Sequence, residues 1–292
     1  MDKVSIVIPA YNHAAFLSYA IKSVIDQSYP IHEIIVVDDG STDNTKTVAC
    51  RYKQIDYYYK TNSGSANAIN YGIEKSTGSY IGILNDDDTY SKNHISTALS
   101  NLKTYGNELF VGKPLIIGEG RKYFDLKYQT QLSELQINNL GLISSLFRNN
   151  WALSTSSFVF DKKLSTVIKG FQNFTSCPDL DFLLRTIFEA GASVGTCKNP
   201  TWSYRCHLNN SVSFIDSGIQ FAEILYVLGR VYYQFNGNKL SSSFKKLVGY
   251  GVDPMYLVKL EETKPWILED GQTVSESLNN WKKTFIDWYS QL

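Results

Sequence analysis

Through its first hundred residues the chain alternates between two hydrophobic periods, and this alternation restricts its fold more than any other feature. Short β-branched runs give way to segments in which apolar residues recur every three or four positions. Such alternation is typical of an α/β sheet whose parallel strands are joined by helical crossovers. The expected strands are 4–8, 33–37, 57–59 and 80–84, with helices over about 17–25 and 65–75.

All four expected strands finish in polar residues. In a parallel sheet the carboxyl ends of neighbouring strands lie at one edge, and ligands bind in the crevice beyond them. Five carboxylates are predicted to meet there, and they repel one another unless a cation or hydrogen-bond donors compensate them. The polar strand ends are Tyr11-Asn12, Asp38-Asp39, residues 62–64 and the run Asn85-Asp86-Asp87-Asp88.

The triplet Asp86-Asp87-Asp88 has two interpretations. A hard divalent ion such as Mg²⁺ takes oxygen ligands, typically one or two protein carboxylates together with phosphate oxygens. Alternatively, the triplet is a solvated turn in which Asp88 or Ser91 caps a helix that starts near residue 91. The second acidic strand end, Asp38-Asp39, favours the metal, because so many carboxylates without a ligand are hard to justify.

The composition argues against several classes of protein. Lys and Arg balance Asp and Glu at 28 each, so no net charge draws the chain to nucleic acid or anionic lipid. No apolar run approaches the roughly 18 to 20 residues of a membrane span, and the N-terminus has no signal-peptide layout. The four cysteines are far apart and are expected to be reduced. We therefore expect a cytoplasmic protein, either soluble or peripheral at the inner face of the membrane.

Beyond residue 105 the pattern is weaker. Strands are expected at 109–111, 115–117 and 156–160. An amphipathic stripe from Leu180 to Phe188 ends at Gly191, a natural helix stop. After residue 215 the chain reads mostly helical, with stripes over roughly 218–234 and 273–290.

Four blocks of the first half are recognisable: VSIVIPAYN, EIIVVDDGSTDNT, NSGSANAINYGI and GSYIGILNDDDTY. In order and spacing they resemble the N-terminal half of family 2 glycosyltransferases, and the resemblance returns at STSSFVFDKKLSTVIKGF and PDLDFLLR. It implies the GT-A fold, an α/β fold with a mixed, mostly parallel central sheet flanked by helices. The implied domains are a catalytic domain over 1–214 and a helical C-terminal extension over 215–292. Residues 1–104 would form the nucleotide-sugar-binding half and 105–214 the acceptor-side half.

The resemblance also implies a nucleotide site. Pro9 and Tyr11 would line the base pocket, and Asp39 would accept a hydrogen bond from the uracil imide of a UDP-sugar. This chemistry is sensible, since an aromatic ring stacks on a base and a carboxylate reads an N–H donor. The other nucleotide-binding residues that the resemblance implies are Asn67, Asp86 and Asp87.

Plainer interpretations of the same strand ends stay open. Tyr11 can be an ordinary turn residue. Asp38 can cap the helix that follows it, a role for which Ser41 and Asp43 compete.

The last block matches the family's Asp-x-Asp-type motif, except that Asn85 stands where the first aspartate is customary. One of Asp87 and Asp88 is implied to ligate Mn²⁺ or Mg²⁺ while the other contacts ribose or supports the site, so both are candidate ligands. In TWSYRCHLNNSVS, His207 would complete the metal shell or touch the diphosphate, and Arg205 would neutralise the leaving phosphate. A lone histidine is also often a structural hydrogen-bonding residue.

An inverting transfer requires a base that takes the proton of the acceptor hydroxyl. The resemblance aligns Asp179 with the family's catalytic aspartate, after the turn Gly170-Phe171, and puts Pro178 where Glu is common. The first turn of a helix favours an ionised carboxylate, which would keep Asp179 basic.

Asp179 also has a structural interpretation, because Ser176 and Asp179 have the spacing of a capping box. Asp181 is expected to pair with Arg185 one helical turn later.

The implied function is metal-assisted, inverting transfer of a sugar from a UDP-sugar to a saccharide or lipid-linked saccharide, without nucleic acid. One rival is a sugar nucleotidyltransferase, but PAYNHAAF lacks the Gly-rich basic loop expected of that class. Another is a binding module that has lost the chemistry, which the departures at Asn85 and Pro178 favour. A dehydrogenase is disfavoured because no G-x-G-x-x-G follows the first strand.

The C-terminal stripes also have two interpretations. An aromatic and basic helix can lie in a membrane interface, which suits a lipid-linked acceptor, or it can pack on the catalytic domain or on a second subunit. The residues of the last stripe are Trp281, Lys282, Lys283, Phe285, Trp288 and Tyr289.

Overall fold

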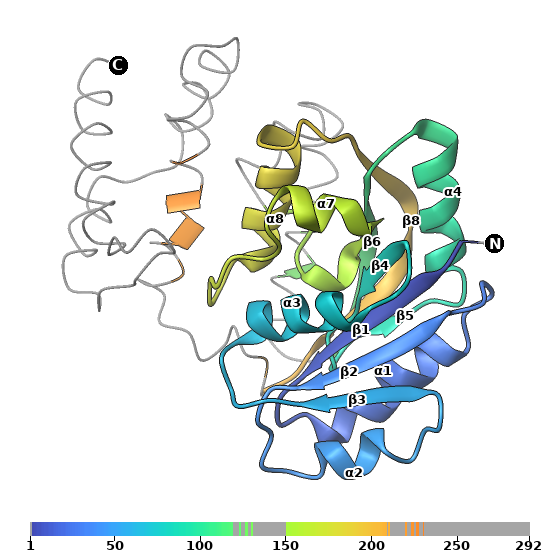
Figure 1. Cartoon of the computed structure of the whole chain (residues 1–292), viewed down its shortest axis with the longest axis vertical. Helices are drawn as coiled ribbons and strands as arrows, with labels where there is room; N and C mark the ends of the chain where they lie inside the picture. Colours follow the sequence, from blue (N-terminus) through green and yellow to red (C-terminus); the bar gives the residue numbers. More distant parts are fainter. Residues whose placement is uncertain are drawn as a thin grey trace. The chain divides into compact units, whose positions relative to one another are not determined.

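The structure is a computed structural model that describes residues 2–118, 150–208 and 210, with single helical positions at 123–130 and 220–230 (Figure 1). By contacts the chain divides into two compact units. The first contains Met1–Thr130 and Ala152–Leu208, and the second contains Gln131–Trp151 and Asn209–Leu292. All elements named below belong to the first unit.

The centre of this unit is an eight-stranded sheet in the order β3-β2-β1-β4-β7-β6-β8-β5. Four of its seven strand pairings are parallel and three are antiparallel, which agrees with the predicted mixed, mostly parallel sheet. The strands are β1 (Val4–Ala10), β2 (Glu33–Asp38), β3 (Ile55–Tyr59), β4 (Tyr80–Ile83), β5 (Thr89–Tyr90), β6 (Leu109–Gly118), β7 (Phe158–Asp161) and β8 (Val194–Cys206).

Helices connect the strands and cover both faces of the sheet. Along β2, Ile34 and Val36 join the core cluster that also holds the apolar residues of α1, α2 and α4, whereas Ile35 and Val37 pack with Ala68 of α3. Strands buried on both faces read as continuous apolar runs, which is why the sequence shows them clearly. The helices are α1 (Ala14–Ile25), α2 (Thr45–Ala49), α3 (Ser65–Lys75), α4 (His94–Tyr105), α7 (Lys162–Val167) and α8 (Pro178–Phe188).

The second half of the sheet differs from the sequence expectation. The two short strands expected at 109–111 and 115–117 form one strand, β6, whose register against β8 shifts on both sides of Lys113. Pro114 has no N–H to donate, and such an irregularity accommodates it. Strand β8 was not predicted, because its sequence VGTCKNPTWSYRC lacks apolar alternation and its pairing with β6 is a tertiary effect.

Other elements agree more closely. The strand expected at 156–160 begins at Phe158, after a 3₁₀ turn over Thr155–Ser157. The helix expected near residue 91 begins at His94, with Asn93 and not Asp88 or Ser91 at the N-cap. Helix α8 ends at Phe188, shortly before Gly191 takes a left-handed φ of 63°.

The C-terminal expectations fall almost entirely outside the described residues. The stripe over 273–290 lies outside the described residues, and only single positions of the stripe over 218–234 are described. Within the described part of the chain, no helix has the length and apolarity to cross a membrane. The predicted domain boundary at residue 214 stays a prediction.

Candidate functional site

The loop that follows β1 is clamped between the ends of β2 and β4. The backbone N–H of Tyr11 donates to Asp86 Oδ2 at 2.9 Å, and the N–H of Asn12 donates to Ser41 Oγ at 2.9 Å. The N–H of Ala14, at the start of α1, donates to Asp43 Oδ2 at 2.9 Å. The clamp leaves Tyr11 47% exposed at the edge where the strand ends meet.

Asp38 and Asp39 are both buried, each with its own donors. Asp38 accepts hydrogen bonds from the N–H of Ser41 at 2.8 Å and from the hydroxyl of Tyr57 at 2.6 Å, so it closes the turn after β2 and does not cap a helix. Asp43, in contrast, accepts from the N–H of Thr45 at 2.9 Å, in the first turn of α2.

Asp39 pairs with Lys60 Nζ at 2.6 Å and accepts from the N–H of Gly64 at 2.8 Å. Gly64 has a φ of 97°, which favours glycine, and it is the N-cap residue of α3. Asn67 lies in the first turn of that helix, where its side-chain amide donates to Ser63 O at 2.7 Å. Asp39 and Asn67, two of the implied nucleotide-binding residues, thus both contact the loop of residues 63–64.

Asp86 is buried beneath the loop that follows β1. Its Oδ2 accepts from the Tyr11 N–H, and its Oδ1 lies 2.8 Å from His13 Nδ1. Burial, opposed by the His13 hydrogen bond and assisted by the charge of Asp87, raises the pKa of Asp86 to about 6. This carboxylate is therefore expensive to ionise without more positive charge nearby.

Asp88 is also buried and is held from the opposite side. Ser156 Oγ donates to Asp88 Oδ2 at 2.6 Å, and the backbone N–H of Arg205 donates to Asp88 Oδ1 at 3.0 Å. Burial and the neighbouring Asp87 raise the pKa of Asp88 well above its usual range. Asp88 thereby joins the end of β4 to the end of β8.

Asp87 lies between these two and meets Arg205, near the end of β8, and His207, just beyond it. Its Oδ2 lies 3.0 Å from His207 Nε2, and its carbonyl oxygen accepts from Arg205 Nε at 3.1 Å. The guanidinium of Arg205 stands 5.5 Å from the ring centroid of Phe16 and 5.6 Å from that of Tyr19, so α1 supports it through cation–π contacts.

Within the described residues, one group of side chains has metal-ligand spacing, and it consists of His13, Asp87 and His207. One candidate ligand atom from each residue lies within 4.8 Å of the others. Sequence reasoning selected Asp87 and His207 but missed His13. The signal was slight, because a histidine two positions after Tyr11 marks a strand-end loop but does not indicate a ligand.

Asn85, where an aspartate is customary, has a structural role in this chain. Its side-chain amide donates to Ser154 Oγ at 3.0 Å, and its Oδ1 accepts from Thr155 Oγ1 at 2.9 Å. Its backbone N–H donates to Ser156 Oγ at 3.0 Å. Asn85 therefore fixes the 3₁₀ turn that carries Ser156 to Asp88.

Asp179 lies in the first turn of α8, directly after Pro178, and its side chain is buried. The N-cap residue of this helix is Cys177, whereas the capping-box interpretation required Ser176 there. Burial above all, then the charges of Asp88 and Asp87 and also that of Asp179, raise the pKa of Tyr204. The charges of Asp87, Asp88 and Asp179 thus all act on one tyrosine of β8.

The predicted pair within α8 is confirmed. Asp181 Oδ2 lies 2.6 Å from Arg185 Nη2, and both side chains are buried. Arg185 also donates to the carbonyls of Ile168 and Gly170, the latter at 2.8 Å. This network fixes α8, and with it Asp179, against the Gly170-Phe171 turn.

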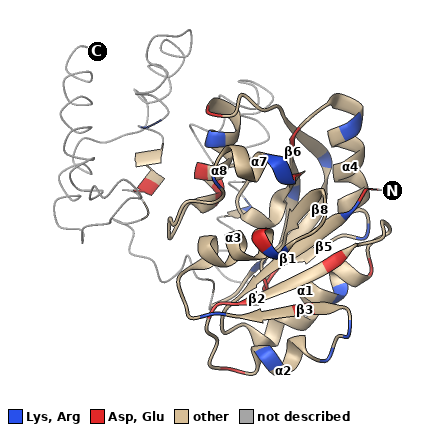
Figure 2. Cartoon of the chain, viewed as in Figure 1, with Lys and Arg blue, Asp and Glu red and all other residues tan. Residues whose placement is uncertain are grey.

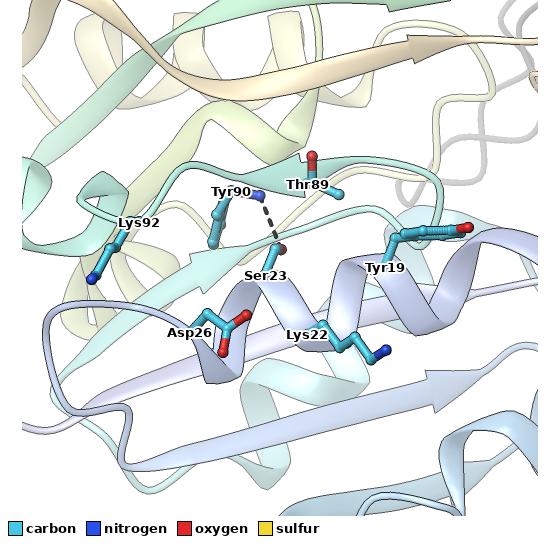
Figure 3. A pocket seen from close by; sticks show the side chains of 7 residues that line it. All are labelled: Tyr19, Lys22, Ser23, Asp26, Thr89, Tyr90 and Lys92. Atoms are coloured by element: carbon cyan, nitrogen blue, oxygen red, sulfur yellow. Dashed lines mark hydrogen bonds between the residues drawn. The ribbon is translucent and has the colours of Figure 1, made fainter.

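A separate hollow of about 570 Å³ runs along α1 and β5, and Figure 3 shows its side chains. The hydroxyl of Ser23 accepts a hydrogen bond from the N–H of Tyr90 at 3.0 Å across its floor. The hollow contains none of the acidic triplet, although Tyr19 belongs both to its wall and to the Arg205 contact. Its lining residues are Tyr19, Lys22, Ser23, Asp26, Thr89, Tyr90 and Lys92.

Comparison with solved structures defines the class of fold. The chain superposes on S. aureus TarS in complex with UDP-GlcNAc with a TM-score of 0.65 and 17% identity, over 85% of this chain and 71% of that one. It superposes on glucosyl-3-phosphoglycerate synthase from Mycobacterium tuberculosis, in complex with Mn²⁺, UDP and glucosyl-3-phosphoglycerate, with a TM-score of 0.56 and 17% identity, over 79% and 80% of the two chains. These likenesses confirm the predicted GT-A fold.

Comparison of the amino-acid sequence with known families identifies the family of the chain. Residues 5–167, more than half of the chain, match the family model described as glycosyl transferase family 2, and the chain belongs to this family. A curated relative, an uncharacterized glycosyltransferase of Rickettsia typhi, is 37% identical over 165 residues. That match covers 54% of this chain and 52% of the relative, so the chain spans about half the length of this relative.

Proposed function

We propose that this protein is an inverting glycosyltransferase that moves a sugar from a nucleotide-sugar to a hydroxyl of a saccharide or lipid-linked saccharide. UDP-sugars are the first donors to test, because two structures of the same fold were solved with UDP or UDP-GlcNAc. One observation carries the proposal. The acidic triplet, the Tyr11 loop, Arg205 and His207 converge at the ends of β1, β4 and β8.

The nucleotide would lie across the loop after β1. The half-exposed ring of Tyr11 offers a stacking surface for a base, next to Pro9 at the end of the strand. Asp39 would read the imide of a uracil, and since Lys60 now occupies one of its oxygens, the base would share or displace that contact.

A divalent ion fits the residues at the centre of the site. Asp87 and His207 offer a carboxylate oxygen and an imidazole nitrogen side by side, and the raised pKa values of Asp86 and Asp88 indicate a place that favours added positive charge. Asp87 and His207 would hold Mn²⁺ or Mg²⁺, while Asp88 would support the site from behind. When bound, the ion would act as a Lewis acid toward the leaving nucleotide diphosphate.

The remaining chemistry belongs to the protein's own residues. Asp179 would take the proton of the acceptor hydroxyl while that oxygen forms its bond to the anomeric carbon. The bond from this carbon to the diphosphate oxygen breaks in the same displacement, which inverts the configuration. The guanidinium of Arg205 would offset the negative charge that builds on the leaving phosphate.

A binding module without transfer activity is the second candidate, and Asn85 favours it, because this residue is committed to the Ser154–Ser156 turn. Release of the nucleotide diphosphate would distinguish a transferase from such a binding module.

The experiment is a panel of UDP-GlcNAc, UDP-glucose and GDP-mannose, incubated with the protein and Mn²⁺ and assayed for released nucleotide diphosphate. We expect one donor to release its nucleotide diphosphate slowly, with water as the acceptor. EDTA should lower that rate at least about tenfold, since the ion stabilises the leaving group. Binding of a donor in a thermal-shift assay without any release would favour the binding module.

A lipid-linked acceptor would bring the protein to a membrane surface, which the aromatic and basic residues near Trp281 can promote. We expect full-length protein to float with anionic liposomes and a version truncated near residue 270 to float less. Equal flotation of the two proteins, or none in either, would count against this role for the last stripe.

A further inference from the structure

We propose that His13 is a third protein ligand of the divalent ion, with Asp86 orienting its ring, so that two imidazoles and one carboxylate hold the metal. This inference rests on the proposed function, because it concerns the same ion. It assigns a role to His13, for which the sequence blocks imply none, and gives Asp86 an orienting role in place of the nucleotide contact that the resemblance implies. His13 enters from the loop after β1, whereas Asp87 and His207 enter from the ends of β4 and β8.

The first support is position. A ligand atom of His13 lies within 4.8 Å of those of Asp87 and His207, so the three atoms surround a space of the size that one ion fills. The ring centroids of His13 and His207 are 5.3 Å apart with an interplanar angle of 86°. The two imidazole rings therefore stand nearly perpendicular and do not stack on each other.

The second support is the hydrogen bond between His13 Nδ1 and Asp86 Oδ1, at 2.8 Å. A metal-bound histidine usually donates its other ring N–H to a carboxylate, which fixes the ring and makes the ligating nitrogen more basic. With Nδ1 as the donor, the lone pair of His13 is on Nε2. Asp86 is itself fixed, because its second oxygen accepts from the Tyr11 N–H.

Packing restrains both imidazoles as well. The Phe16 ring, in the first turn of α1, lies 6.1 Å from the His13 ring and 4.4 Å from the His207 ring, measured between centroids. An apolar ring that touches both histidines limits their rotation. Preorganised ligands bind a metal with less loss of conformational freedom.

Two consequences follow for the ion. Three protein ligands would leave three positions of a six-coordinate ion for diphosphate oxygens and water, so the site should bind metal before the nucleotide arrives. Mg²⁺ is a hard ion that takes oxygen ligands and gives up its water reluctantly, whereas Mn²⁺, a transition-metal ion, accepts imidazole nitrogen more readily. We therefore expect Mn²⁺ to bind at least about tenfold more tightly than Mg²⁺ in the absence of nucleotide.

The test uses the full-length protein and Mn²⁺ alone, without nucleotide. Pulsed electron paramagnetic resonance of bound Mn²⁺ counts the coordinated imidazole nitrogens, and we expect two in the native protein and one in His207→Ala. His13→Ala and His13→Gln should each lose one imidazole and weaken Mn²⁺ binding by about ten- to a hundredfold. His32→Ala is the matched control. His32 lies just before β2, is exposed, and forms a hydrogen bond with the hydroxyl of Thr77, away from the site.

Asp86→Asn tests the orienting role separately. The deciding measurement is the affinity for Mn²⁺, whether this variant keeps both imidazole signals or loses one. We expect Asp86→Asn to weaken Mn²⁺ binding by about tenfold and His32→Ala to leave it unchanged. Unchanged Mn²⁺ affinity in Asp86→Asn would remove Asp86 from the proposal.

The native spectrum decides the question even if a His13 variant fails to fold. A single coordinated imidazole, which disappears in His207→Ala, would overturn the assignment of His13 and leave it as a hydrogen-bond partner of Asp86. Failure of the proposed function looks different. In that case two imidazoles bind Mn²⁺ but no nucleotide-sugar is turned over.

Discussion

At the scale of single residues, Asp86, Asp87 and Asp88 are adjacent in sequence but meet three different sets of partners. Asp86 faces Tyr11 and His13, Asp87 faces His207, and Asp88 faces Ser156 and the backbone of Arg205. The triplet therefore joins the ends of three strands, and its mutual repulsion is a cost that a bound cation would offset.

A second point at the scale of single residues concerns Asp179, the proposed catalytic base. We predict that Asp179→Asn lowers the transfer rate by about two to four orders of magnitude, the usual contribution of a general base. Binding of UDP should change little, because Asp179 acts on the acceptor. Asp56→Asn, on the exposed face of β3, is the control and should retain full activity. Near-normal turnover by Asp179→Asn would remove this residue from the mechanism.

The buried His94 leads to a prediction about how the free energy of unfolding depends on pH. Its ring is fully buried, with Nδ1 3.0 Å from Thr201 Oγ1, and burial lowers the pKa of His94 from its ordinary value of 6.5 to about 3. Below pH 6.5 the imidazole of His94 binds a proton in the unfolded chain, whereas in the folded chain it stays neutral until the pH approaches 3. The free energy of unfolding should therefore fall as the pH drops from 6.5 toward 3, by up to about 1.4 kcal/mol per pH unit from this group.

Urea unfolding at pH 7, 6, 5 and 4 checks this prediction. His94→Gln cannot titrate, so its free energy of unfolding should fall less steeply between pH 6 and 4 than that of the native protein. Its lower stability at pH 7 does not matter, because only the slopes are compared. Parallel pH profiles for the two proteins would contradict the prediction.

At the scale of elements, the position of α8 depends on a buried ion pair. Asp181→Asn leaves the Arg185 guanidinium buried without its counter-ion, which should cost about 3–5 kcal/mol. Glu74→Gln, in the exposed pair of Glu74 with Lys75, should leave stability nearly unchanged. The measurement is the midpoint of urea unfolding for both variants. A loss in Asp181→Asn no larger than that in Glu74→Gln would mean that this pair does not fix α8.

The elements also show how far the sequence alone could lead. Strands β1, β2 and β4 were predictable because they are buried on both faces and carry continuous apolar runs. Strand β8 was not, because it is half-exposed and its register is set by β6. Within the site, Asp87 and His207 could be selected from motif spacing. The contacts of His13 with Asp86 and of Asp88 with Ser156 depend on strand neighbours far apart in the sequence.

At the scale of the whole molecule, the site belongs to one of the two compact units, because every contact described for it lies within Met1–Thr130 and Ala152–Leu208. Basic and acidic residues are interspersed over the described elements (Figure 2). Electrostatic selection of a ligand must therefore come from local clusters such as the triplet and Arg205, and not from a general field.

The account depends most on the claim that these residues surround one nucleotide diphosphate and its ion. The most direct measurement is a crystal structure of the protein with UDP and Mn²⁺. We predict an ion coordinated by Asp87 and His207, with diphosphate oxygens on the ion and the Asp179 carboxylate facing the same cavity. An ion held elsewhere, or Asp179 directed into solvent away from the nucleotide, would contradict the claim.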